Sequence, residues 1–358
     1  MLKKLSKQKI SDIITYGIVL VAFIVMQILI NAGQISSLFE GLMVPLCTYI
    51  ILAISLNLVV GVLGELSLGH AGFMCVGAFT SAFFSKCMQD TITNSIVRFL
   101  IALLIGIVVA AIFGLLIGIP VLRLNGDYLA IVTLAFGEII KNLINVLYIG
   151  VDDKGLHVAT SAAGLHLEAG GKQILKGALG ISGTATLYKD IKNYFFLIGV
   201  ILLLLTLFIV QNLVNSRSGR AIMSTRDNRI AAESVGINIT KYKLLAFTIS
   251  AALAGVAGVL YAHNLSLLKV SVFDYNMSIL VLVYVVLGGI GNIRGSIIAT
   301  IILYALPELL RGFANYRMLI YAIVLIIMML FNWAPAARDW RARMVEKFKG
   351  KKTKKEVA

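Results

Sequence analysis

Apolar runs long enough to cross a lipid bilayer dominate this sequence of 358 residues. A transmembrane helix needs about 20 mostly apolar residues, because the hydrocarbon core of a bilayer is about 30 Å thick. Inside lipid the backbone must satisfy its own hydrogen bonds, so such runs are expected to be helical. Only 14% of the residues are charged, against about a quarter in soluble domains. The sequence therefore predicts an all-α polytopic membrane protein, with residues 1–358 forming a single transmembrane domain.

By length and hydrophobicity the runs predict about ten transmembrane helices. These cover residues 13–30, 42–60, 66–85, 96–119, 128–148, 194–214, 244–265, 277–290, 296–310 and 317–331. The first run is longer than the apolar stretch of about 7–15 residues in a secretory signal peptide. We therefore expect it to remain as an uncleaved first span.

Basic residues flank the apolar runs and give the chain a net charge of +15. Cytoplasmic loops of membrane proteins carry an excess of Lys and Arg, which predicts that both termini and the loop at residues 215–243 face the cytoplasm. An even number of spans satisfies this orientation. Residues 336–358 are then a basic cytoplasmic tail, which anionic membrane lipid attracts. No nucleic-acid-binding signature accompanies the charge, so we expect no nucleic acid partner.

Residues 150–193 are predicted to form an extracytoplasmic loop. The segment is rich in Gly, Ala, Ser and Thr and is too long for a simple turn, so we expect it to carry short helices of its own. It is either a solvated connector or a surface that meets an extracytoplasmic partner.

The loop at residues 215–243 combines positive charge with a helical pattern. It holds six basic residues against two acidic ones. Ser224 and Asp227 have the spacing of a capping box, and residues 230–233 are compatible with one or two helical turns. Gly236 stands where a residue just past a helix end would. A short helix between two membrane spans would present a docking surface.

Glycines and small polar residues interrupt the third apolar run within GVLGELSLGHAGFMCVGAF, residues 61–79. Glycine-interrupted spans mark the discontinuous helices that line transporter pathways, and intramembrane polar residues are functional candidates. The candidate translocation pathway comprises Glu65, Ser67, Gly69, His70 and Gly72. The alternative is tight helix packing, in which neighbouring carbonyl groups bond the serine and the histidine.

Two further features are less specific. Glu138 and Lys141 stand three residues apart in a predicted span, a spacing at which they can pair, although a proton-coupled carrier would also need such a residue. The glycines of VLGGIGNIRGS, residues 286–296, have no βαβ context. They predict a tight turn rather than a dinucleotide site.

Sequence signatures of catalysis or cofactor binding are not found. The chain contains no G-x-x-x-x-G-K-[ST] phosphate loop, no G-x-S-x-G elbow and no H-E-x-x-H. Cys47, Cys75 and Cys87 lie in or near apolar runs without C-x-x-C spacing, which predicts packed side chains rather than a disulfide or a metal site. We expect a protein that is not an enzyme and that binds no cofactor or metal.

Four stretches resemble the LivM-type permeases of branched-chain amino acid ABC importers. GELSLGHAGFMCVGAF is similar to their G-Q-L-S-L-G-H signature, and LAIVTLAFGEIIKNL to their next segment. GRAIMSTRDNRIAAESVGINITKYKLLAFTISAALAGVAGVLYA resembles their cytoplasmic coupling loop and the following span, and VLGGIGNIRGS their later glycine turn. Two positions depart from the family pattern: Glu65 replaces the usual Gln, and Ser296 the usual Pro.

This resemblance implies the permease fold of type II ABC importers, in the plasma membrane of a bacterium or archaeon. It implies a second permease subunit, cytoplasmic ATPases and an extracytoplasmic solute-binding protein as partners. The expected activity is ATP-driven import of leucine, isoleucine or valine by alternating access. The ATPases would dock on the coupling-loop residues that match the family: Arg226, Asp227, Asn228, Ala231, Ala232, Glu233 and Gly236.

Two alternatives stay open at this point. Related permeases of the same architecture carry other small solutes, such as urea, short amides, sugars or nucleosides. An ion-coupled secondary carrier, which needs no ATPase, would instead use Glu65, His70 and Glu138.

Overall fold

The computed structural model describes residues 2–32, 37–124, 126–152, 155–167, 170–183, 186–313 and 316–333. Helices dominate these ranges, which confirms the all-α prediction, and the predicted tail at residues 336–358 lies outside them. The α-helices are α1 (Leu2–Asn31), α2 (Ser37–Asn57), α3 (His70–Cys87), α4 (Ser95–Val121), α5 (Asp127–Val146), α6 (Thr186–Asn215), α7 (Arg217–Asp227), α8 (Arg229–Ser234), α9 (Ile239–Asn264), α10 (Tyr275–Gly288), α11 (Ile293–Leu309) and α12 (Arg317–Trp333).

Six helices in the described ranges are long and apolar enough to cross a membrane. They are Phe39–Leu63, Ser95–Val121, Asp127–Val146, Tyr194–Asn215, Ile239–Asn264 and Ile293–Gly312. Two shorter apolar helices, Thr15–Ile30 and Tyr275–Gly288, accompany them. The number of ten spans is therefore not confirmed. The third predicted span, residues 66–85, starts late because α3 begins only at His70.

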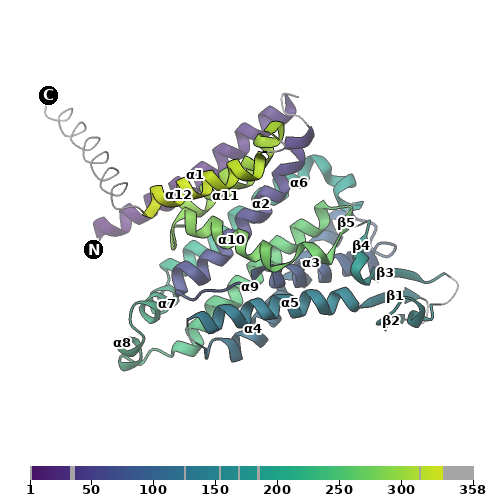
Figure 1. Ribbon diagram of the computed structural model, residues 1–358, viewed down its shortest axis with the longest axis horizontal. Helices are drawn as coiled ribbons and strands as arrows, with labels where there is room; N and C mark the ends of the chain where they lie inside the picture. Colours follow the sequence, from purple (N-terminus) through teal and green to yellow (C-terminus); the bar gives the residue numbers. More distant parts are fainter. Residues whose placement is uncertain are drawn as a thin grey trace.

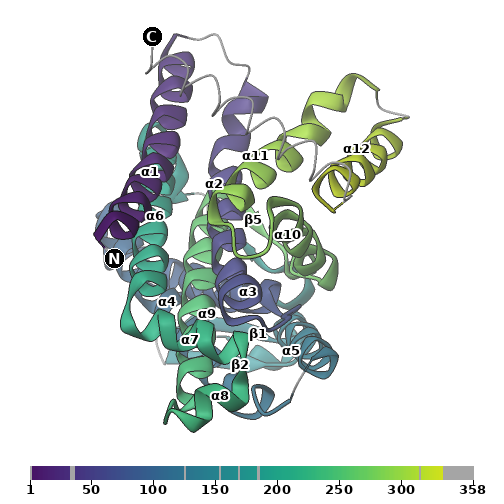
Figure 2. The same ribbon diagram turned by 90° about the vertical axis from the view of Figure 1, so that its left-hand side faces the viewer.

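Helices α2 and α9 form the centre of the molecule and are buried over most of their length. α9 packs against α2, α3 and α4. Figure 2 shows this group in the middle, with α1 and α12 on opposite flanks. The outward faces of α1, α4, α5 and α12 expose large apolar side chains, among them Ile28, Leu104, Ile131 and Ile327. Such apolar surface is expected where lipid or another protein covers it.

Small residues let the central helices approach closely. A Cβ built on Gly258 of α9 would lie 2.1 Å from the backbone oxygen of Met74 in α3, and one on Gly77 would lie 2.6 Å from the Cα of Gly255. Lipid provides no hydrophobic driving force between helices, so van der Waals contact at such short range carries much of their association.

A small antiparallel sheet lies at the end of the bundle opposite α7 and α8 (Figure 1). Its strand order is β2-β1-β3-β4-β5. The strands are β1 (Tyr148–Asp152), β2 (Gly155–Ala159), β3 (Lys172–Lys176), β4 (Ile181–Ser182) and β5 (Leu267–Leu268). The predicted loop at residues 150–193 does contain short helices, Ala163–Leu165 and Gly177–Leu179, but the strands around them were not predicted.

The sequence did not predict the sheet, because part of its strand pairing joins residues far apart along the chain. The bond register matches Ile181 of β4 to Leu268 of β5, a residue that follows α9. Strands this short have little preference of their own, since their stability comes from packing and cross-strand neighbours. The residues after α9 thus add the last strand to a sheet whose first strand follows α5.

The close approach of α9 to α3 predicts that Gly258→Ala destabilises the protein. The added methyl group has no space beside the Met74 oxygen, and overpacking of this kind costs about 1–3 kcal/mol. The thermal midpoint of the detergent-solubilised chain, followed by size-exclusion chromatography after heating, measures the effect. The matched control is Gly41→Ala in α2, where an added Cβ meets no atom within 4 Å. Equal midpoints for the two variants would contradict the observed packing.

Candidate functional site

The helical backbone is interrupted between α2 and α3, within the predicted pathway segment. α2 continues into the π-helix Leu58–Leu63, which ends at Gly64 in a left-handed conformation with φ +81°. Residues 64–69 have no regular structure, and α3 begins at His70. π-helical turns frequently occur at functional sites. The prediction of a glycine-interrupted span is confirmed. We call residues 58–69 the broken segment.

Asn57 ties the start of the broken segment to the turn between α10 and α11. Its Oδ1 accepts a bond from the Gly291 backbone N at 2.9 Å, and its Nδ2 donates to Ser296 Oγ at 2.9 Å. Gly61 permits this approach, because a Cβ there would lie 2.4 Å from the Gly291 nitrogen. Gly289 and Gly291 have φ values of +95° and +79°. The predicted tight turn at residues 286–296 is confirmed.

His70 lies at the first position of α3 and is fully buried. Its Nε2 is 3.0 Å from Ser250 Oγ, and that hydroxyl donates to the Ser55 backbone oxygen at 2.5 Å. Because the hydroxyl hydrogen is used in this way, Ser250 accepts from His70, and the imidazole carries its proton on Nε2. Its Nδ1 and the buried Ser67 Oγ have no hydrogen-bond partner in the described part of the chain.

Gly69 and Gly72 bring α3 against α5. A Cβ on Gly69 would lie 2.4 Å from the Thr133 backbone oxygen, and one on Gly72 would lie 2.7 Å from the Cα of Gly137. The Leu68 backbone N donates to Thr133 Oγ1 at 3.0 Å. The space beside these two glycines is therefore filled by α5, as the packing alternative expects.

Glu65, the remaining predicted pathway residue, pairs with Lys243 at the start of α9. The side chains of Lys243 and Glu65 are only 8% and 13% exposed. Nearby, Arg226 donates from Nη1 to the Gly61 backbone oxygen at 2.8 Å. The broken segment thus contains the predicted pathway residue Glu65 and is contacted by the predicted docking residue Arg226.

The loop at residues 215–243 folds into two short helices, α7 and α8 (Figure 1). The predicted capping box was wrong: Ser224 lies inside α7, where its hydroxyl donates to the Ala221 oxygen at 2.8 Å. α8 starts instead at Asn228, whose Oδ1 accepts from the Ala231 backbone N at 3.0 Å. Gly236 follows the end of α8 with φ +82°, as predicted. Asparagine can cap a helix as serine does, and this signal was available in the sequence.

The exposed surface of α8 is partly apolar. Ile230 is 80% exposed and Val235 is 74% exposed, whereas Ala232 is buried. Arg229 and Glu233 form an ion pair along the helix, with Nε and Oε1 3.6 Å apart. Sequence reasoning placed the docking surface here but did not single out Ile230 and Val235. The signal that could have identified these two residues is the presence of large apolar side chains in an otherwise polar loop.

Glu138 and Lys141 form the predicted pair on α5, with Oε2 and Nζ 2.5 Å apart. Glu138 also accepts from the Tyr275 backbone N at 3.1 Å, so it caps the first turn of α10. This carboxylate has a structural role at the junction of α5 and α10.

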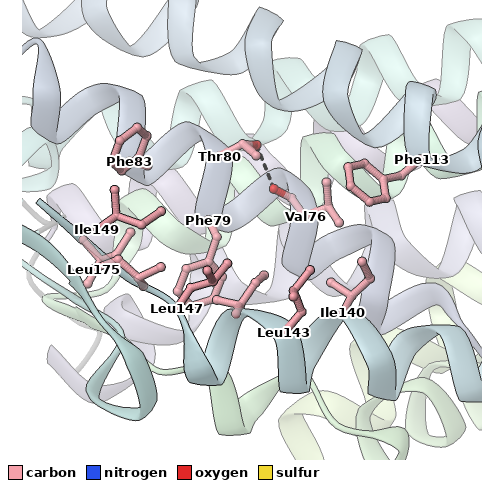
Figure 3. A pocket seen from close by; sticks show the side chains of 12 residues that line it. Val76, Phe79, Thr80, Phe83, Phe113, Ile140, Leu143, Leu147, Ile149 and Leu175 are labelled. Atoms are coloured by element: carbon pink, nitrogen blue, oxygen red, sulfur yellow. Dashed lines mark hydrogen bonds between the residues drawn. The ribbon is translucent and has the colours of Figure 1, made fainter. Parts of the chain in front are cut away.

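An apolar pocket of about 200 Å³ lies between α3, α4, α5 and the sheet (Figure 3). Its walls include Val76, Phe79, Leu143 and Ile149. Thr80 is the one polar residue among the described residues that line it, and its hydroxyl donates to the Val76 oxygen at 2.7 Å. A zwitterionic amino acid needs partners for its charged groups, and this pocket offers none.

A polar cavity of about 650 Å³ lies beside the sheet, between the end of α3 and β3. Lys86, Asp90, Asp152 and Lys172 line it. Lys172 Nζ is 2.6 Å from Asp90 Oδ2. This hydrogen bond and the positive charge of Lys172 hold the pKa of the Asp90 carboxyl below its usual range. This end of the molecule therefore presents both signs of charge to a polar partner.

No group of three His, Cys, Asp or Glu residues that could hold a metal ion occurs among the described residues. Cys47 and Cys75 are buried, Cys87 is half-buried, and all three are free thiols.

Comparison with known proteins decides the family. The model of the branched-chain amino acid transport system / permease component family matches residues 37–331. The chain belongs to this permease family. The motifs thus identified it correctly.

Two relatives share 37% identity with this permease over 294 residues. They are the high-affinity branched-chain amino acid transport system permease proteins LivM of Salmonella typhimurium and of Escherichia coli. The match covers 80% of this chain and 66% of each relative, slightly less than two thirds of their length. The fructose import permease protein FruG of Bifidobacterium longum is 24% identical over 348 residues, 93% of this chain and 94% of that protein. No solved structure matches this permease significantly.

The bond between Asn57 and Ser296 predicts measurable coupling between the broken segment and α11. Ser296→Ala leaves the buried Asn57 Nδ2 without its partner, which costs about 1–3 kcal/mol. Asn57→Ala removes the same bond, although the Ser296 hydroxyl keeps its bond to the Asn292 oxygen. In a double-mutant cycle, the double variant should lose about 1 kcal/mol less stability than the sum of the losses in the two single variants. Thermal midpoints of the two single variants and the double variant measure this. Strict additivity would show that the bond is not formed.

Proposed function

We propose that the chain is the membrane-spanning permease subunit of an ATP-driven ABC importer that carries branched-chain amino acids into the cytoplasm. The observation that supports this most directly is family membership together with 37% identity to two LivM permeases. The chain lacks a phosphate-binding loop of its own. ATP hydrolysis is therefore assigned to partner subunits, and the chain itself is not an enzyme.

Docking of the ATPase is assigned to α8 and its flanks. The proposed surface comprises the predicted residues Asp227, Asn228, Ala231, Ala232, Glu233 and Gly236, with Ile230 and Val235 added. Two exposed apolar side chains on a short helix suit a groove on a partner, because buried apolar anchors dominate binding energy. Arg226, the remaining predicted docking residue, donates from its guanidinium to the Gly61 oxygen. It therefore connects the proposed docking surface to the broken segment.

Solute movement is assigned to the neighbourhood of Ser67, Gly69, His70 and Gly72. Ser67 Oγ and His70 Nδ1 support this, because they have no partner among the described residues and buried polar atoms are normally hydrogen-bonded. The path would open between this chain and a second permease subunit by alternating access, in which packed helices shift between two arrangements. Gly69 and Gly72 now contact α5, so a shift of α5 would uncover the path here.

The two ends of the bundle are assigned to opposite sides of a bacterial or archaeal plasma membrane. The N-terminal end of α1, which carries several lysines, lies toward the same side as α7 and α8 (Figure 1). By the positive-inside rule we assign that side to the cytoplasm. The sheet and its polar cavity would then face outward and receive a solute-binding protein.

Import of another solute is the second candidate, because the fructose permease of Bifidobacterium longum aligns with nearly the whole chain. Uptake of radiolabelled leucine decides between them. The chain is expressed with its ATPases, second permease and binding protein in a host that lacks branched-chain amino acid uptake. Isoleucine and valine should compete with leucine, whereas fructose, urea and nucleosides should not. Uptake of fructose without any leucine uptake would overturn the proposed solute. Uptake that persists without the ATPases would indicate an ion-coupled carrier.

The proposed docking surface predicts that Ile230→Asp releases the ATPase. Loss of an interface anchor costs about 2 kcal/mol or more, which corresponds to about a 30-fold weaker complex. The yield of ATPase that co-purifies with the tagged chain in mild detergent measures this. Ser234→Ala on the same helix is the control and should retain the ATPase. Equal yields from Ile230→Asp and the native chain would place docking elsewhere.

A further inference from the structure

Two charged contacts join the broken segment to the chain on either side of α8. Before α8, Arg226 Nη1 donates to the Gly61 oxygen at 2.8 Å. After α8, Lys243 pairs with Glu65. Both acceptors belong to the segment between α2 and α3. The exposed helix α8 is thus attached through both of its flanks to the interrupted backbone.

The pair between Lys243 and Glu65 is shielded from water, with both side chains less than 15% exposed. When one partner of a buried pair is removed, an uncompensated charge remains in a poorly solvated site, which is strongly unfavourable. Glu65 is therefore expected to follow Lys243 whenever the start of α9 moves.

The contact of Arg226 is positioned by its neighbours. Asp227 Oδ1 accepts bonds from Arg226 Nε and Nη2 at 3.1 and 2.9 Å, which orients the guanidinium. Gly64 leaves space for the arginine stem, since a Cβ there would lie 2.4 Å from Arg226 Cγ. The same glycine adopts the left-handed conformation that ends the π-helix. Because Gly64 has no side chain, it can both adopt the conformation that ends the π-helix and leave space for Arg226.

The far end of the broken segment leads directly to the unpaired polar atoms. Glu65 is followed by Ser67 and His70, without regular structure before α3. This end is held by other helices, since the Ala71 backbone N donates to Ser278 Oγ of α10 at 3.1 Å. A displacement of Glu65 would therefore change how Ser67 and His70 lie relative to α5 and α10.

We propose that Arg226, Lys243 and Glu65 form a link that transmits displacement of α8 to the candidate solute path. This inference rests on the proposed function, because the partner ATPases supply the displacement. In this link Lys243 and Glu65 act as positioning residues, through the backbone that leads to Ser67 and His70. Breaking the link leaves ATP hydrolysis running while less solute is carried per ATP.

The test uses the whole complex, reconstituted in proteoliposomes with ATP inside and binding protein with radiolabelled leucine outside. The readout is the number of leucine molecules imported per ATP hydrolysed, together with the yield of assembled complex. Lys243→Met should lower this ratio about tenfold, within the usual range of coupling between sites. Glu65→Met, which keeps the side-chain length and removes both the charge and the hydrogen-bond acceptor, should do the same even where Lys243→Met fails to assemble. Lys241→Met, on the exposed side of α9, is the matched control.

Charge reversal separates coupling from a general loss of structure. The double variant Glu65→Lys with Lys243→Glu should recover most of the native ratio, because the attraction between the two positions is restored. A native ratio in both single variants overturns the link. An equally low ratio in the assembled double variant also overturns it.

Failure of the link and failure of the proposed function give different results. If the native complex neither imports leucine nor hydrolyses ATP, the proposed function fails, and the link fails with it. If the native complex imports leucine and the single variants import it with the same ratio, only the link fails.

Discussion

Lipid offers no hydrogen bonds, so each backbone N–H and C=O of a membrane protein must find its partner within the protein. The break between α2 and α3 depends on this constraint. Arg226 of α7 donates to the Gly61 oxygen, and Thr133 of α5 accepts from the Leu68 nitrogen. Two elements distant in sequence therefore bond backbone groups that an unbroken helix would bond itself. The break is stable only because the rest of the fold surrounds it.

The surrounding scaffold is built by small residues rather than by large apolar ones. Gly258 admits the backbone of α3 next to α9, and Gly72 admits α5 next to α3. Without a hydrophobic driving force between helices in lipid, such short approaches favour a defined arrangement of helices. A site between helices can then be held or shifted as a unit, which suits alternating access better than a loose bundle.

The two ends of the molecule have different chemistry, and the broken segment connects to one of them. At one end α8 exposes Ile230 and Val235 beside charged residues. At the other end the sheet and its neighbouring polar cavity carry lysines and aspartates. The pair between Lys243 and Glu65 joins the end that carries α8 to the broken segment. In the proposed link, a partner that moves α8 acts on the break through Arg226 at the end of α7 and Lys243 at the start of α9.

The sequence by itself determined the class of protein, its family, the interrupted span and the loop that forms α7 and α8, because apolar run length and glycine spacing are local properties. It also determined the pair between Glu138 and Lys141, which are neighbours on one helix. It did not reveal the pairing of β4 with β5 or the pairing of Glu65 with Lys243, which join residues far apart along the chain. The tertiary structure decided these two pairings, because the packing of α9 against α2 and α3 brings the partners within bonding distance.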